Sequence, residues 1–293
     1  MTVKYCIVMG CPRSGTTFLI NALNALPYSE CINELLIPVC IPHIVNHPLP
    51  PTIYNALQLG FETSLERYAN DGKIYSRLLA IQKYINGYMD IQELFQALRQ
   101  NRRIEHLIYK EPYLSFAPEF TYHALPDSQI IYIYRDGRDC ADSNVRTYNV
   151  LADEKLMSLN TLEIFLGHQY DQRYIPWWVE EGKEEEFLAC TPYVRTIWMW
   201  KEIVSRCHNF FSRPEVVASG RVLLIKYEDL VNDSLEYGEM IVEHLGAKMN
   251  AQLRKQFQQA HPRSVGIYKK RNPQEIQKAE EIAKQELALF GYL

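Results

Sequence analysis

An apolar run that ends in glycine leads directly into the loop GCPRSGTT and then into a helical pattern. The run YCIVMG covers residues 5–10, and the apolar residues of TTFLINALNALP recur at helical spacing up to Pro27. This order predicts a buried strand, a loop and a helix. Backbone N–H groups at the start of such a helix form an anion-binding geometry.

The loop resembles the nucleotide-triphosphate loop G-x-x-x-x-G-K-[ST] but departs from it at one position. Gly10 and Gly15 keep the spacing and Thr17 keeps the hydroxyl, whereas Thr16 stands where that loop has lysine. The backbone cradle remains, and the group that reaches the outer phosphates is missing. Arg13 supplies a cation that can make forked contacts with phosphoryl or sulfuryl oxygens. A tight turn without a ligand is the alternative.

Three further runs read as strands: 106–112, 129–135 and 221–230. A short helix fits between the second and third strands, and another follows the fourth. Strands this apolar are usually covered on both faces, and their alternation with helices predicts a parallel sheet. The fold class is therefore α/β, a parallel central sheet flanked by helices with a P-loop-type strand-loop-helix. Ligands bind at the carboxyl ends of such strands, where the sequence places Arg13, Lys110, Glu111, Arg135 and Asp136.

The length suits one domain over 1–293. Around 40–105 and 150–200 the chain is rich in Pro, Tyr and Trp and shows no clean strand. We expect these parts to be insertions over the ligand edge of the sheet. A packed helix begins at Pro273, after Asn272 as N-cap.

Composition excludes several classes of function. The net charge of -4 argues against a broad electrostatic hold on nucleic acid. No apolar run reaches the roughly 18 to 20 residues of a membrane helix. Seven cysteines form an odd set with no C-x-x-C pair or metal-type spacing, which predicts reduced thiols, a cytoplasmic location and no structural zinc.

A second polar cluster lies in IIYIYRDGRDCADSN. Arg135 ends the expected strand 129–135. Ser143 follows eight residues later, in the second turn of a helix that carries Asp136 and Asp139 near its start. The pair Arg135 and Ser143 could hold a second, separate phosphate. A structural ion pair is the usual alternative.

The segments CPRSGTTFL and YRDGRDCADS resemble the paired signature of sulfotransferases that use 3′-phosphoadenosine 5′-phosphosulfate. KYEDL, SVGIYKKRNP and LALFGYL are also similar to family segments, so the likeness runs over most of the chain. It implies a donor site in which the first motif binds the 5′-phosphosulfate and the second the 3′-phosphate. No metal is expected there, because the loop amides, Arg13 and Lys110 could neutralise the leaving phosphate. The implied 5′ residues are Arg13, Ser14, Gly15, Thr16 and Thr17, and the 3′ residues are Arg135 and Ser143.

The motifs are closer to the bacterial and protein-tyrosine branch than to the cytosolic small-phenol branch. The latter has a lysine in the first motif and a base histidine after the second strand, where this chain has Arg13 and YKEP. The resemblance implies Glu34, 21 residues beyond Arg13, as the catalytic base, with a pKa raised by burial. Glu30 and Glu111 are rival bases, as is a histidine such as His43 or His47, and a surface glutamate is the alternative.

Lys110 is expected to stabilise charge on the leaving phosphate, unless it forms a structural salt bridge. Lys269 and Lys270 are expected to close over the 3′-phosphate and adenine end, unless they belong to a solvated turn. Trp198 and Trp200 indicate core packing rather than base stacking.

The expected reaction is in-line sulfuryl transfer to a hydroxyl of an unidentified acceptor, which leaves adenosine 3′,5′-bisphosphate. The acceptor could be a small molecule, lipid, glycan or peptide. A P-loop kinase or NTPase and a non-catalytic nucleotide-binding module are the alternatives.

Overall fold

The computed structural model of the chain describes residues 3–33, 49–70, 75–100, 104–149, 151–158 and 167–293. A five-stranded sheet forms the centre of this part, with all neighbouring strands parallel, in the order β2-β3-β1-β4-β7. Its strands are β1 (Lys4–Met9), β2 (Ser29–Asn33), β3 (His106–Lys110), β4 (Gln129–Tyr134) and β7 (Val222–Lys226). The α/β class predicted from the sequence is confirmed.

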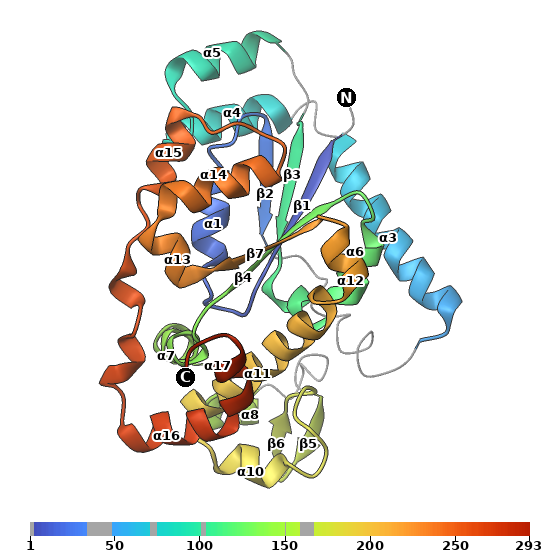
Figure 1. The fold of residues 1–293 in the computed structure, drawn as a ribbon. Helices are drawn as coiled ribbons and strands as arrows, with labels where there is room; N and C mark the ends of the chain where they lie inside the picture. Colours follow the sequence, from blue (N-terminus) through green and yellow to red (C-terminus); the bar gives the residue numbers. More distant parts are fainter. Residues whose placement is uncertain (1–2, 34–48, 71–74, 101–103, 150, 159–166) are drawn as a thin grey trace.

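Helices lie on both sides of the sheet (Figure 1). The α-helices are α1 (Thr16–Leu23), α3 (Pro51–Asn70), α4 (Tyr75–Ile85), α5 (Ile91–Gln100), α6 (Pro118–Ala124), α7 (Gly137–Thr147), α8 (Asp153–Ser158), α10 (Glu184–Ala189), α11 (Pro192–Phe211), α12 (Pro214–Ala218), α13 (Tyr227–Asn232), α14 (Ser234–His244), α15 (Ala251–Phe257), α16 (Pro273–Ile282) and α17 (Lys284–Leu289). The 3-10 helices are η2 (Pro112–Phe116), η3 (Pro262–Ser264) and η4 (Ile267–Lys270).

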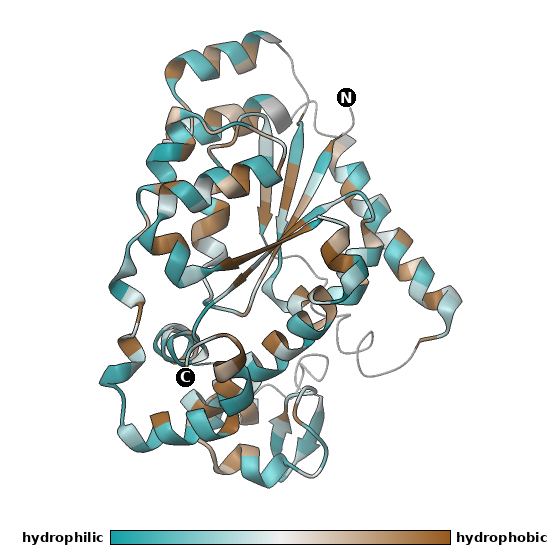
Figure 2. Ribbon diagram, viewed as in Figure 1, coloured by the Kyte–Doolittle hydropathy of each residue, from teal (hydrophilic) through white to brown (hydrophobic). Residues whose placement is uncertain are grey.

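Successive side chains of each buried strand enter different cores. In β1, Ile7 packs with residues of α3, α6 and α11, whereas Val8 packs with residues of α1, α13, α14 and α15. Both side chains are fully buried, and Figure 2 shows brown, apolar segments in the strands of the sheet. This is why these strands read as continuous apolar runs rather than as alternating ones.

The sequence reading missed two features. Strand β2 escaped it because SECIN is short and half polar, and only its pairing with β3 makes it a strand. The region 150–200 contains an antiparallel hairpin of β5 (His168–Tyr170) and β6 (Arg173–Ile175), where no strand was expected. No helix in the described ranges is long and apolar enough to cross a membrane.

The region 40–105 is helical where it is described, and α4 and α5 do not lie over the ligand edge. Lys83 of α4 donates hydrogen bonds to Leu26 O (3.1 Å) and Ser29 Oγ (2.8 Å), at the amino end of β2. Figure 1 shows α4 and α5 at one end of the molecule and α7 at the other. The expectation that this whole region covers the carboxyl edge is therefore wrong for residues 75–100.

Candidate functional site

The loop 10–17 depends on two glycines with positive φ. Gly15 has φ 109°, and a Cβ there would lie 2.4 Å from the ring of Tyr227. A Cβ on Gly10 would lie 2.3 Å from the backbone oxygen of Ile133. The N–H of Gly10 donates to Ser115 Oγ over 2.8 Å, which anchors the loop to the segment after β3. The predicted strand-loop-helix is thus built as a tight, glycine-dependent turn.

Helix α1 begins at Thr16 without a side-chain cap. Ser14 and Thr16 are buried, and Thr17 is exposed. Ser14 Oγ is buried and has no hydrogen-bond partner among the described residues. Buried hydroxyls are almost always paired, so an unpaired one beside an uncapped helix N-terminus is a ready contact for an anion.

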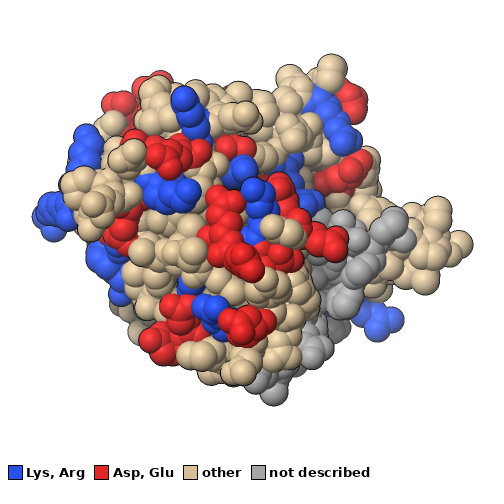
Figure 3. All heavy atoms as spheres, turned by 90° about the horizontal axis from the view of Figure 1, so that it is seen from below, with Lys and Arg blue, Asp and Glu red and all other residues tan. Residues whose placement is uncertain are grey.

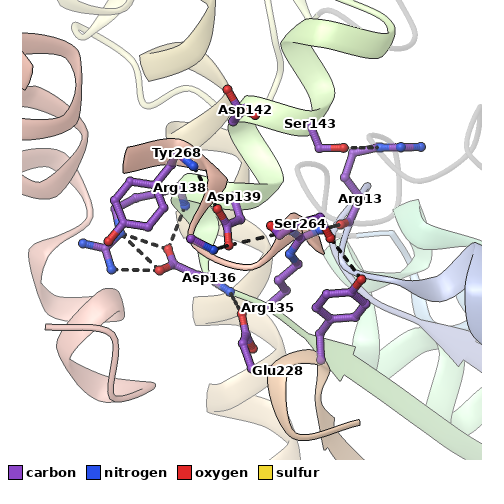
Figure 4. Close-up of polar contacts among 12 residues, drawn as sticks. Arg13, Arg135, Asp136, Arg138, Asp139, Asp142, Ser143, Glu228, Ser264 and Tyr268 are labelled. Carbon is purple, nitrogen blue, oxygen red and sulfur yellow. Dashed lines mark hydrogen bonds and ion pairs between the residues drawn. The ribbon is translucent and has the colours of Figure 1, made fainter. Parts of the chain in front are cut away.

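The loop and the start of α7 touch each other (Figure 4). Arg13 Nε donates to Ser143 Oγ over 3.0 Å, and Arg135 donates through one terminal nitrogen to Arg13 O over 3.2 Å. Ser143 lies in the second turn of α7, as predicted. The residues predicted for the two phosphate sites therefore lie next to each other and are joined through Arg13.

Arg135 is buried and held on several sides. Its other terminal nitrogen donates to Ser264 O and lies 3.7 Å from Asp139 Oδ2. The guanidinium carbon lies 4.5 Å from the centre of the Tyr227 ring. Its Nε is buried without a partner in the described parts of the chain. A charged side chain with an unused donor is available to an anionic oxygen at this point.

The turn from β4 into α7 is fixed by a buried carboxylate that the sequence reading did not single out. Glu228 Oε1 accepts from the N–H of Asp136 (3.0 Å), and Glu228 Oε2 accepts from the hydroxyl of Tyr292 (3.0 Å). Burial raises the pKa of Glu228. Arg138 donates to the backbone oxygen of Tyr292 (2.7 Å) and pairs with Asp136. The segments KYEDL and LALFGYL carry these contacts, so the family likeness was the available signal.

A strap formed by residues 262–271 is tied to α7 by Asp139. The Asp139 carboxylate accepts from the N–H groups of Gly266 (2.7 Å) and Tyr268 (3.1 Å). Burial raises the pKa of Asp139, and these two N–H groups oppose that shift. Lys269 and Lys270 lie on the strap with exposed side chains.

Lys110 ends β3 at the same edge as the loop. It is 5% exposed and is paired in register with Val8 of β1 and Asn33 of β2. Glu34 follows Asn33 in the sequence and lies outside the described residues, as do His43 and His47.

The two rival carboxylates have identifiable local partners. Glu111 is fully buried, and its Oε1 accepts from the N–H of Tyr113 (3.0 Å) at the start of η2. Glu30 is paired in register with Leu107, towards the amino end of β2, and accepts from the hydroxyl of Tyr68 (2.6 Å). Glu30 therefore lies away from the carboxyl edge, whereas Glu111 follows Lys110 at that edge.

The face of the molecule that carries α7 and α16 mixes charges of both signs. Figure 3 shows acidic and basic side chains side by side on this face, with no broad area of one sign. An anion would therefore be held by individual side chains and N–H groups rather than by a broad positive surface. No group of three His, Cys, Asp or Glu side chains within the described ranges is arranged to hold a metal ion.

Comparison with known proteins identifies the family. The model of the sulfotransferase family matches residues 6–251, and the chain belongs to this family. A search of curated proteins finds no match.

Similar solved structures are bacterial sulfotransferases. STF9 from Mycobacterium avium is 17% identical, with 99% of this chain and 78% of that chain covered and a TM-score of 0.50. The sulfotransferase domain of the olefin synthase from Synechococcus PCC 7002 is 15% identical, with 96% and 95% covered and a TM-score of 0.47. A sulfotransferase from Alicyclobacillus acidocaldarius is 16% identical, with 99% and 100% covered and a TM-score of 0.42. At these identities the likeness to STF9 bears on the fold alone.

Proposed function

We propose that the protein transfers a sulfuryl group from 3′-phosphoadenosine 5′-phosphosulfate to a hydroxyl group of an acceptor. The observation that carries this proposal is the contact between the loop and α7, where Arg13 Nε lies 3.0 Å from Ser143 Oγ. A donor with a phosphosulfate at one end of its ribose and a phosphate on the 3′ oxygen presents two anions close together. Membership of the sulfotransferase family supports the same reaction.

The residues of the loop and of α7 fit such a donor. Ser14 Oγ and Arg135 Nε are buried donors without partners among the described residues, and buried polar groups of this kind cost free energy until they are paired. The glycines leave no room for a Cβ, which keeps the turn tight where it leads into the N-terminus of α1. The residues that would hold the 5′ end are Arg13, Ser14, Gly15, Thr16 and Thr17. Arg135 and Ser143 would hold the 3′-phosphate, and Lys269 and Lys270 would approach the adenine end.

The bound donor supplies an activated sulfuryl group on a phosphate leaving group. Lys110 and Arg13 are the cations that would stabilise negative charge on that phosphate, because both come from the carboxyl edge of the sheet. Glu34 would accept the proton of the acceptor hydroxyl. It is the residue after Asn33, whose register partner is Lys110, and this neighbourhood in the chain supports its assignment.

A phosphotransferase is the second candidate. Thr16 is buried and stands where a kinase or NTPase loop carries its lysine, which favours sulfuryl over phosphoryl transfer. A nucleotide-binding module without catalysis would use the same loop. An assay for sulfuryl transfer distinguishes it from an enzyme. The acceptor is a hydroxyl compound, whether small molecule, lipid, glycan or peptide. The cytoplasmic location expected from the cysteine content stays a prediction.

Isothermal titration calorimetry tests the proposal. Adenosine 3′,5′-bisphosphate is expected to bind without metal and more tightly than ATP with magnesium, and the reverse order would contradict the proposal. Mass spectrometry of hydroxyl compounds incubated with donor and protein would then look for an added sulfonate. Tight nucleotide binding with no transfer to any acceptor would favour the binding module.

A further inference from the structure

Helix α4 buries a lysine beside Ala80 and exposes several large aliphatic side chains. Lys83 is 4% exposed and points to the amino end of the sheet, where it contacts Leu26 and Ser29. Leu78 and Ile85 are 62% and 75% exposed. A surface helix normally buries its aliphatic residues and exposes its lysines. The outward side of α4 is therefore a second apolar face.

The exposed residues follow the spacing of a helix contact. Leu78, Ile81 and Ile85 are separated by three and four residues, which are the a and d positions of a heptad. In that register Lys83 takes the f position, on the opposite side of the helix. These three residues therefore form one line along α4, which we call the α4 stripe.

The surroundings enlarge this apolar surface. Tyr84 of α4 is 40% exposed. Helix α5 packs against α4 and exposes Ile91 and Phe95 at 45% and 53%. With the α4 stripe these side chains leave on the order of 600 Å² uncovered, compared with about 800 Å² per partner in a dimer interface of standard size. This is the upper end of the apolar patches found on monomeric proteins, and the largest such patch is often functional.

The charge pattern indicates what covers the surface. Residues 78–89, LLAIQKYINGYM, contain a single Lys, Arg, Asp or Glu, which is the buried Lys83. In a two-fold contact a surface meets its own copy, so an exposed charge near the axis would face the same charge. A membrane-binding helix would instead carry basic residues along its polar side. Exposed charges stand only at the two ends of this stretch, at Arg77 and Asp90, and none lies between them. A stripe without an exposed charge along its length fits a second copy of the chain.

We propose that the α4 stripe is the interface of a two-fold symmetric homodimer. Helices α4 and α5 lie at the end of the molecule remote from α7 (Figure 1), so the loop and Arg135 of both copies stay uncovered. The proposal does not depend on the donor or on the acceptor. Its partner is defined by the apolar α4 stripe and by the absence of an exposed charge within residues 78–89.

Sedimentation velocity over a concentration series through the micromolar range tests the proposal. The wild-type protein is expected to change from monomer to dimer as its concentration rises. Ile81→Asp and Ile85→Asp each place two like charges in the contact, and each is expected to raise the dissociation constant at least about 10-fold. The melting temperature of the isolated monomer should stay unchanged for Ile85→Asp, because that side chain is 75% exposed.

Val217→Asp is the matched control. Val217 is 66% exposed and lies on α12, on another side of the molecule, so its replacement should leave the dissociation constant unchanged. A wild-type protein that stays monomeric over the whole series overturns the proposal. So does a dimer that Val217→Asp weakens as much as Ile85→Asp, or one that neither Ile81→Asp nor Ile85→Asp weakens.

Discussion

The indole nitrogen of Trp200 donates a hydrogen bond to the backbone oxygen of Arg135 over 3.0 Å. Trp200 is fully buried, and its ring lies so close to Gly137 that a Cβ there would be 2.3 Å away. Trp200 therefore packs against the turn from β4 into α7 and holds it by this hydrogen bond. The prediction that it packs in the core is confirmed, and a stacking role on the nucleotide base is excluded.

Trp200→Phe is expected to lower the free energy of unfolding, because it leaves the buried oxygen of Arg135 unpaired. An unpaired buried acceptor costs about 1 to 3 kcal/mol, and the smaller ring adds a cavity term. Urea unfolding measures the change. Trp198→Phe is the control, since the indole nitrogen of Trp198 has no partner among the described residues. Equal losses in the two variants would show that the hydrogen bond contributes nothing.

Ser14→Ala should separate stability from nucleotide binding. It removes a buried hydroxyl that has no partner in the described structure, so the free energy of unfolding should stay the same or rise. Affinity for adenosine 3′,5′-bisphosphate should fall about 3- to 10-fold, the effect of one lost hydrogen bond. Ser115→Ala is the opposite case. Its hydroxyl accepts from the N–H of Gly10, so that variant should lose stability.

Arg135→Ala should remove the preference for a 3′-phosphate. Wild-type protein is expected to bind adenosine 3′,5′-bisphosphate much more tightly than 5′-AMP, because a charge-assisted contact contributes roughly 1.5 to 3 kcal/mol. Calorimetry with both nucleotides measures the ratio, and thermal unfolding confirms that the variant folds. Arg146→Ala is the control, because Arg146 lies on the same helix with an exposed side chain. A ratio near one in the wild-type protein would refute the 3′-phosphate site.

Glu34→Gln should reduce turnover by about 100-fold or more while the donor-binding constant stays nearly the same, the usual result of losing a positioned general base. Glu111→Gln is the control. Glutamine keeps an oxygen that can accept from the N–H of Tyr113, so folding should be preserved. Normal turnover in Glu34→Gln together with an inactive Glu111→Gln would move the base beside Lys110. If both variants stay active, His43 or His47 becomes the candidate.

Lys83→Met is expected to change how stability depends on pH. Burial lowers the pKa of Lys83 from its ordinary 10.5 to about 8. Between these two values the folded state has lost the proton that the unfolded state keeps, so the wild-type protein gains stability as the pH rises from 8 to 10.5.

The methionine variant should lack this gain. The unfolding free energy of the variant minus that of the wild type should therefore fall with rising pH, by up to about 3 kcal/mol. Urea unfolding at several pH values measures the difference. A difference that stays constant from pH 7 to 10.5 would contradict the assigned shift.

The parts of the fold that could be predicted are those that local sequence determines. The strand before Gly10 is a continuous apolar run, and glycines at fixed spacing identify the loop. Ser143 was placed on the correct turn of α7, because an apolar strand and a helix start flank Arg135 closely in the sequence.

The parts that escaped prediction depend on contacts between distant segments. Strand β2 exists only through its pairing with β3, more than 70 residues later. The hydrogen bond between Arg13 and Ser143, and the role of Glu228 between Asp136 and Tyr292, appear only when the chain is folded. No periodicity in the sequence reports such contacts.

The hydrogen bonds that join Arg138 and Glu228 to Tyr292 also bear on how the protein folds during its synthesis on the ribosome. Chains are made from the N-terminus, and early segments fold while later ones are still being added. The loop, Arg135 and Ser143 all emerge well before Tyr292, whose backbone oxygen and hydroxyl brace the start of α7. A growing chain therefore carries every predicted anion contact of the loop and of α7 before it carries this brace. Firm nucleotide binding is thus expected only after Tyr292 has been added, and a nascent chain halted before Tyr292 should hold adenosine 3′,5′-bisphosphate only weakly.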